Sequence, residues 1–239
     1  MKLLLISNST MPGEAYLDYP KKEIKKFLGE KPLTAVFIPY AAVTFSFDEY
    51  CEKVEERFAE IGHHIVGIHT FNDPVKAIEH AEAIVVGGGN TWQLVRMLHD
   101  KKLMNPIRER VYYGIPYIGW SAGSNVACPS LRTTNDMPII DPKGFDCTGM
   151  IPFQINPHYL DANPEGHGGE TREQRIQEFL EINPDCFVAG LREGTMFKII
   201  DDSLELIGKR KCRIFKKGHE PKELSAGDDF SFLLGIKPC

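Results

Sequence analysis

A serine flanked by glycines is the residue in this chain best suited to nucleophilic catalysis. Ser121 lies in Gly119-Trp120-Ser121-Ala122-Gly123, which has the G-x-S-x-G form of a nucleophile elbow and follows an apolar segment typical of a strand. Such a sharp turn needs glycines where a Cβ would collide with neighbouring backbone. The motif therefore predicts Ser121 at the carboxyl end of a sheet, with the Ala122 N–H free to stabilise an oxyanion.

A second glycine-rich segment, Val86-Gly87-Gly88-Gly89-Asn90-Thr91, also joins an apolar strand to a helical pattern. Its backbone amides could approach a phosphate or the oxyanion of acyl transfer. It lacks both the G-x-G-x-x-G spacing of dinucleotide folds and the Lys-Ser/Thr ending of a P-loop. Beside a serine elbow, we interpret it as an oxyanion loop that supplies the Gly88 N–H, with Asn90 as a candidate substrate contact.

A serine hydroxyl needs a base to remove its proton, and histidine is the usual one. Among the eight histidines, His158 is favoured because it follows a probable strand at 153–155 and the stiff pair Asn156-Pro157. His167 is the alternative, although the glycines around it predict a segment that would position an imidazole badly.

Two carboxylates could orient that histidine. Asp136 lies in the long irregular segment 129–150 after the elbow, and Glu193 follows an apolar strand and precedes a glycine. Triads are recognised by geometry and not by chain order, so the sequence leaves both open. We favour Asp136 slightly and expect the other acid to bind substrate or to support the site.

The composition limits the class of protein. The 239 residues are 42% hydrophobic and 26% charged, which suits a single catalytic α/β domain over residues 1–239. A net charge of −5 with scattered basic residues predicts neither a nucleic-acid nor a membrane partner. The apolar run at the start is too short to span a bilayer. Monomer and homodimer both stay open.

No metal site or disulfide framework is indicated by the cysteines and histidines. The six cysteines have no paired spacing, so reduced thiols in the cytoplasm are expected. The acidic and histidine residues at 158, 161, 165 and 167 could be interpreted as metal ligands, but their spacing matches no known coordination motif. We therefore predict no metal.

The elements that position these residues follow from alternating patterns. Apolar strands are expected at 2–7, 35–39, 64–68 and 83–86, and helices at 20–28, 46–61, 74–81 and 91–98. This alternation predicts a parallel sheet with helices on both faces. Short strands at 186–191, 196–200, 204–207 and 213–216 predict a mainly antiparallel C-terminal extension of the same sheet.

Several long motifs in order resemble peptidase E, the α-aspartyl dipeptidase family of serine peptidases. They are the segments 5–10, 87–91, 119–123, 132–138, 154–158 and 165–176. The resemblance implies a flavodoxin-like fold similar to the class I glutamine amidotransferases, with Ser121 in place of their cysteine. It also implies hydrolysis of dipeptides that begin with aspartate, without a metal or cofactor.

Such a substrate makes demands that other residues could meet. The side-chain carboxylate of an N-terminal aspartate needs a fixed cation, for which Arg172 and Arg132 are candidates. The free α-amino group needs an acid, for which Glu165, Glu170 or Glu193 could serve. A cyanophycinase-like hydrolase of aspartate-containing polymers and a non-catalytic flavodoxin-like module that binds a small molecule are the alternatives.

Overall fold

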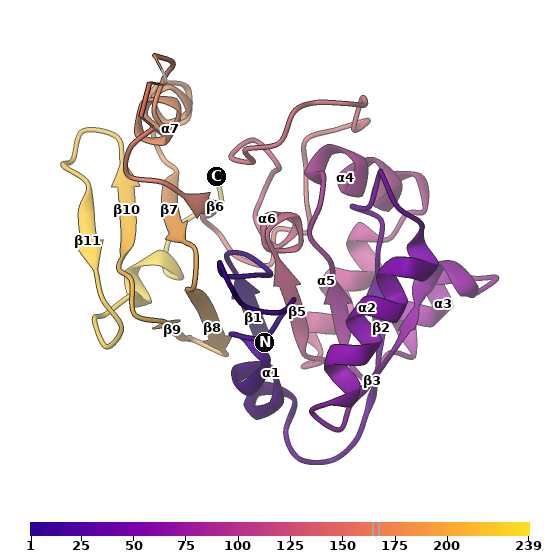
Figure 1. Ribbon diagram of the computed structural model, residues 1–239. Helices are drawn as coiled ribbons and strands as arrows, with labels where there is room; N and C mark the ends of the chain where they lie inside the picture. Colours follow the sequence, from indigo (N-terminus) through magenta and orange to yellow (C-terminus); the bar gives the residue numbers. More distant parts are fainter. Residues whose placement is uncertain (164, 167) are drawn as a thin grey trace.

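The first half of the chain alternates strands and helices, as the sequence predicts (Figure 1). The computed structural model describes residues 1–163, 165–166 and 168–239. The elements of this half are β1 (Lys2–Ile6), α1 (Lys21–Leu28), β2 (Thr34–Ile38), α2 (Phe47–Ala59), β3 (His64–Gly67), η1 (Ile68–Thr70), α3 (Pro74–Glu79), β4 (Ile84–Val86), α4 (Thr91–Asp100), α5 (Met104–Tyr112), β5 (Tyr117–Trp120) and α6 (Ala122–Ala127).

The central sheet has the strand order β3-β2-β4-β5-β1-β8-β9. Its first five strands are parallel, so their carboxyl ends meet at one edge. In such sheets ligands bind outside that edge. The predicted elbow lies there, at the end of β5.

Helices cover both faces of this sheet, which confirms the predicted architecture. Successive side chains of a strand point to opposite faces. Leu3 and Leu5 accordingly pack in the hydrophobic cluster formed with α3, α4, α5 and α6, whereas Leu4 and Ile6 pack in the cluster formed with α1 and α2. These four strand residues have no solvent exposure, so the sheet edge is carried on a rigid core.

Local capping signals fix where several helices begin. Ser46 forms a capping box with Glu49 at the start of α2, and Thr171 forms one with Gln174 at the start of α7 (Arg172–Ile182). Asp73 accepts hydrogen bonds from two backbone N–H groups of the first turn of α3. Each satisfies helix N–H groups that have no intrahelical partner.

The second half of the chain departs from the prediction. Its remaining elements are β6 (Gln154–Tyr159), β7 (Phe187–Arg192), β8 (Met196–Ile200), β9 (Ser203–Ile207), β10 (Cys212–Lys216), β11 (Lys222–Leu224) and η2 (Ser231–Leu233). Strands β8 and β9 do extend the central sheet in antiparallel fashion. Strands β7 and β10 instead join β6 and β11 in a second sheet of order β11-β10-β7-β6. In Figure 1 this sheet lies beside the first, with α7 packed on it.

An arginine at the end of β7 ties the second sheet together. Arg192 contacts the carboxylates of Asp161 and Glu223, and hydrogen bonds from the arginine lower the pKa of both acids.

Within the described residues, no helix combines the length and apolarity that a membrane span needs. Cys186 and Cys239 are joined as a disulfide, with Cα atoms 5.0 Å apart, where the sequence predicted reduced thiols.

Candidate active site

The turn that carries Ser121 has the geometry of a nucleophile elbow. Ser121 lies between β5 and α6 with φ 52° and ψ −112°, a left-handed conformation that strains a residue with a Cβ by about 1–3 kcal/mol. A Cβ on Gly123 would collide with the carbonyl of Val86, and one on Gly119 with the carbonyl of Gly123. These contacts explain why both flanking positions are glycine.

Two backbone amides near Ser121 are available to an oxyanion. The Ala122 N–H lies in the first turn of α6, where helix N–H groups have no intrahelical acceptor. Gly88 lies against the nucleophile, because a Cβ built on it would be 3.1 Å from the Ser121 Cβ. Neither amide donates to another backbone group of the described chain. The structure therefore brings both predicted donors to the serine.

A buried tyrosine holds the Gly88 loop in place. The Tyr50 hydroxyl donates to the Gly88 carbonyl oxygen at 2.9 Å and accepts from the Trp120 indole N–H at 3.2 Å. Tyr16 Oη lies 3.0 Å from it and must be the donor, since the single Tyr50 proton is already used. Burial raises the pKa of Tyr50 to about 12, so this arrangement is that of a neutral phenol.

His158 reaches Ser121 from the second sheet. Its Nε2 lies 3.0 Å from Ser121 Oγ, and it stands at a register shift in β6 with φ 53°. The hydroxyl of Ser7 accepts from the His158 backbone N–H at 3.0 Å and donates to the Leu191 carbonyl at 2.7 Å. The end of β1 thereby positions the histidine.

Glu193 is the carboxylate on the other ring nitrogen. Its Oε1 lies 2.7 Å from His158 Nδ1. Because an ionised carboxylate only accepts, the proton belongs on Nδ1, and Nε2 is left to accept the proton of Ser121. Asn8 accepts from the backbone N–H of Gly194 at 2.9 Å, which fixes the turn that carries Glu193. The side chains of Ser121, His158 and Glu193 thus form one hydrogen-bonded chain.

Asp136, which the sequence favoured as the orienting acid, has different partners. Its Oδ2 accepts from the backbone N–H and the hydroxyl of Thr91 at 2.7 and 2.6 Å, and from the hydroxyl of Thr134 at 3.1 Å. The carboxylate is therefore held on the N-terminus of α4. Glu193 and not Asp136 reaches His158, because β7 runs parallel beside β6 and their ends meet.

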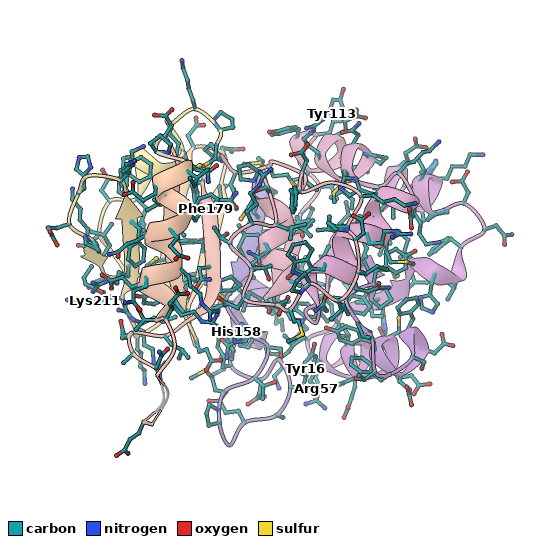
Figure 2. All side chains as sticks on the ribbon, turned by 90° about the horizontal axis from the view of Figure 1, so that it is seen from above. Tyr16, Arg57, Tyr113, His158, Phe179 and Lys211 are labelled. Atoms are coloured by element: carbon teal, nitrogen blue, oxygen red, sulfur yellow. A yellow bond between two sulfur atoms is a disulfide. The ribbon has the colours of Figure 1, made fainter. Side chains whose placement is uncertain are left out.

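Asp136 nevertheless faces the reaction centre across a cleft of about 420 Å³. The cleft is lined by Ser9, Tyr16, Phe45, Tyr50, Lys53, Gly88, Gly89, Trp120, Ser121, Asp136 and His158. A smaller adjoining pocket of about 150 Å³ is lined by Arg132, Thr133, Thr134, Asn135, Asp136, Asn156, Arg172, Arg175, Ile176 and Phe179. Asp136 lines both, so it marks their junction. Figure 2 shows His158 between Phe179 of the pocket and Tyr16 of the cleft.

The candidate arginines differ in their surroundings. Arg172 is half-buried in the pocket, and burial, with a contribution from Arg175, lowers its pKa. It has no carboxylate partner among the described residues, whereas Arg175 lies 3.7 Å from Glu170. Arg132 is exposed and stacks over the Phe145 ring at 4.8 Å. Arg172 is therefore the cation best placed for an incoming anion.

The two remaining candidates, Asn90 and Glu165, line neither the cleft nor the pocket among the described residues. Asn90 caps α4 by accepting from the Gln93 N–H and donates to the Met137 carbonyl at 3.0 Å, so its amide is engaged within the chain. Glu165 is exposed in the segment before α7. His167, the alternative base, lies outside the described residues. Among those described, no group of three His, Cys, Asp or Glu side chains is arranged to hold a metal ion.

Sequence reasoning missed the residues that support the site. Ser7 and Asn8 follow β1 directly, at the same sheet edge as the elbow, so their position was a usable signal. Tyr50 lies within the amphipathic pattern of α2, where a tyrosine is indistinguishable from an ordinary core residue. Its role depends on a contact between α2 and the loop after β4 that no local pattern encodes.

Known proteins resemble this chain along most of its length. The family model of Peptidase family S51 matches residues 3–207. Peptidase E of Nostoc sp. is 52% identical over 98% of this chain and 96% of its own. Peptidase E of Salmonella paratyphi A is 50% identical over 96% of this chain and 100% of its own.

A solved structure shares the fold at low sequence identity. A peptidase from an acI-B1 Actinobacterium superposes with a TM-score of 0.66, at 18% identity, over 95% of each chain. The serine elbow, the histidine and the glutamate lie within the matched residues 3–207. This chain belongs to peptidase family S51.

Proposed function

We propose that this peptidase hydrolyses dipeptides whose first residue is aspartate, through an acyl-enzyme on Ser121. The observation that carries the proposal is the continuous hydrogen-bonded chain Ser121–His158–Glu193 at a cleft that adjoins an arginine pocket. A serine with a positioned base can perform acyl transfer, and Arg172, which has no carboxylate partner among the described residues, supplies a site for a carboxylate.

The reaction then proceeds in two acyl-transfer steps. His158 Nε2 takes the Ser121 proton while Oγ attacks the carbonyl carbon of the aspartyl residue, and the N–H groups of Gly88 and Ala122 stabilise the oxyanion. The imidazolium gives that proton to the leaving amine as the peptide bond breaks. Water, deprotonated by the same imidazole, attacks the ester, and free aspartate leaves as the serine regains its proton.

Recognition of the first residue follows from the junction of cleft and pocket. We place the side-chain carboxylate of the substrate aspartate at Arg172, and its α-ammonium group at Asp136. Asp136 suits this role because Oδ2 takes all the hydrogen bonds that this carboxylate accepts within the described chain. Its Oδ1 is left for a charged donor, an interaction that is roughly twice as strong as a neutral hydrogen bond.

We also propose that residues 1–239 act as one catalytic domain. Ser121 is carried by the central sheet, whereas His158 and Glu193 are carried by the ends of β6 and β7 in the second sheet. Neither sheet holds a complete set of these groups. Separating the two sheets would therefore separate the nucleophile from its base.

Steady-state cleavage of Asp-Leu, Glu-Leu, Asn-Leu, Leu-Asp and longer aspartyl peptides tests the proposal. We expect the highest kcat/KM on Asp-Leu, and a loss on the order of 10⁴- to 10⁶-fold in Ser121→Ala. A serine-directed phosphonate should label the wild type and the control Ser203→Ala, which changes an exposed serine of β9, but not Ser121→Ala. Near-normal turnover by Ser121→Ala would overturn the assignment of the nucleophile.

A further inference from the structure

The cleft is also lined by a group of residues that the chemistry has not used. Phe45, Tyr16 and Lys53 line the cleft with the nucleophile but do not line the pocket of Arg172. If the first substrate residue occupies the pocket side, the leaving residue must lie here. These side chains therefore face the amino acid that departs with the new amino group.

Among the described residues that line this cleft, Lys53 is the only lysine or arginine. It belongs to α2, three positions after Tyr50, so both side chains project from one face of the helix. Its Nζ lies 4.1 Å from the centroid of the Tyr16 ring. This cation–π contact holds the ammonium group at the cleft while leaving N–H donors free.

Lys53 differs from several basic residues of α1 and α2 that have acidic partners. Arg57, one turn further along α2, pairs with Glu56 and Glu60, and Lys21 also pairs with Glu60. Lys53 has no carboxylate within ion-pair distance in the described part of the chain. A cation held at a catalytic cleft without an internal counter-ion is suited to an anionic part of the ligand.

The surroundings of Lys53 suit an amino-acid residue with an apolar side chain. Phe45 is 46% exposed, and its ring centroid lies 5.2 Å from that of Tyr50. With Tyr16 it forms aromatic walls beside the lysine. The combination of aromatic walls and one cation complements an apolar residue with a free carboxylate.

We propose that Lys53 binds the C-terminal carboxylate of the dipeptide and that Phe45 and Tyr16 contact its second side chain; this rests on the function proposed above. In a dipeptide the carboxylate is only one residue beyond the scissile carbonyl, about 3.8 Å between Cα atoms, so one lysine at the cleft can contact it. With Asp136 on the α-ammonium group, the cleft recognises both charged ends of its substrate. Lys53 is thus a determinant of chain length and not of the first residue.

The test compares Asp-Leu with Asp-Leu amide, which lacks only the terminal charge. The wild type should prefer Asp-Leu by about tenfold in kcat/KM, a size expected for one charge-assisted contact in a partly open cleft. In Lys53→Met the KM for Asp-Leu should rise until the preference is lost. Cleavage of the amide should match that by the wild type. Lys53→Arg should keep the preference, and added salt should weaken it in the wild type.

Lys22→Met is the matched control, because Lys22 is an exposed lysine on the neighbouring helix α1, and it should behave as the wild type on both substrates. Equal losses on both substrates in Lys53→Met, or no change on either, would overturn the assignment of Lys53. Those outcomes leave the proposed function intact as long as cleavage of the amide still requires Ser121. Cleavage that survives Ser121→Ala would instead overturn the proposed function.

Discussion

Replacing each of the two acids at the site tests which one acts with His158. Glu193→Gln keeps the size of the side chain but removes its charge from the imidazole. At an effective dielectric constant of about 20 to 40, which suits a partly exposed pair, unit charges 2.7 Å apart interact by roughly 3–6 kcal/mol. The imidazolium forms only during the reaction, so this loss falls on the transition state.

The expected result is a fall in kcat of about 10²- to 10⁴-fold for Glu193→Gln on Asp-Leu, since each 1.4 kcal/mol is tenfold in rate. A glutamine that turns its amide N–H₂ toward Nδ1 would add to the loss, because the other tautomer puts a proton on Nε2.

Asp136→Asn should act on binding and not on the chemical step. An asparagine oxygen can still accept from Thr91, so the start of α4 is kept, but the charge for the α-ammonium group is lost. A charged hydrogen bond contributes about 1.5–3 kcal/mol, which corresponds to a 10- to 100-fold loss in kcat/KM, mainly through KM. On succinyl-leucine, which is Asp-Leu without its α-amino group, Asp136→Asn should match the wild type.

The opposite pattern would refute this reasoning. If Asp136→Asn lowered kcat by several orders of magnitude on both substrates while Glu193→Gln stayed near normal, Asp136 would be the orienting acid. The hydrogen bond between His158 and Glu193 would then be incidental to catalysis. Circular dichroism and thermal unfolding of both variants provide the control for folding.

Three further predictions concern the support of the site. Tyr50→Phe should lower kcat by about tenfold or more with little change in KM, because the oxyanion loop loses its anchoring hydrogen bond; an unchanged kcat would contradict this. Ser121→Gly should be more stable to urea than Ser121→Ala by about 1 kcal/mol, since glycine relieves the positive φ. Arg192 lowers the pKa of Asp161 and Glu223 in the folded state. The stability from this contact is therefore present above the ordinary pKa values of these acids, 3.8 and 4.5, and is lost as the pH falls below them. In Arg192→Met the unfolding midpoint should accordingly fall less on acidification than in the wild type.

Much of the first sheet could be predicted from the sequence because its signals are local. Each of these signals can be recognised from a few neighbouring positions: apolar strand patterns, capping residues, and glycines where two backbone segments come close together. The elbow is the clearest case, since Gly119 and Gly123 are required by contacts that any such turn makes. The predicted helices of this half lie within a few residues of the observed ones.

The second sheet could not be predicted, because a strand pattern does not state which strand it pairs with. The segments that became β7 and β10 looked no different from those that became β8 and β9. The same ambiguity left Asp136 and Glu193 unresolved. Asp136 lies in an irregular segment and Glu193 follows an apolar one, and only the parallel pairing of β6 with β7 brings the end of β7 beside His158.

The hydrogen bond between nucleophile and base is a property of the contact between the sheets. Ser121 and His158 both have positive φ, and such strain persists only where the surroundings over-determine it. Glycines in its own motif account for Ser121, but no glycine adjoins His158. What holds His158 is the hydroxyl of Ser7, which bonds to its backbone N–H and to Leu191 of β7. Strand β1 is also hydrogen-bonded to β5, so the distance from Ser121 to His158 is set where the two sheets meet. Each motif could therefore predict its own residue, but not the hydrogen bond that joins the two.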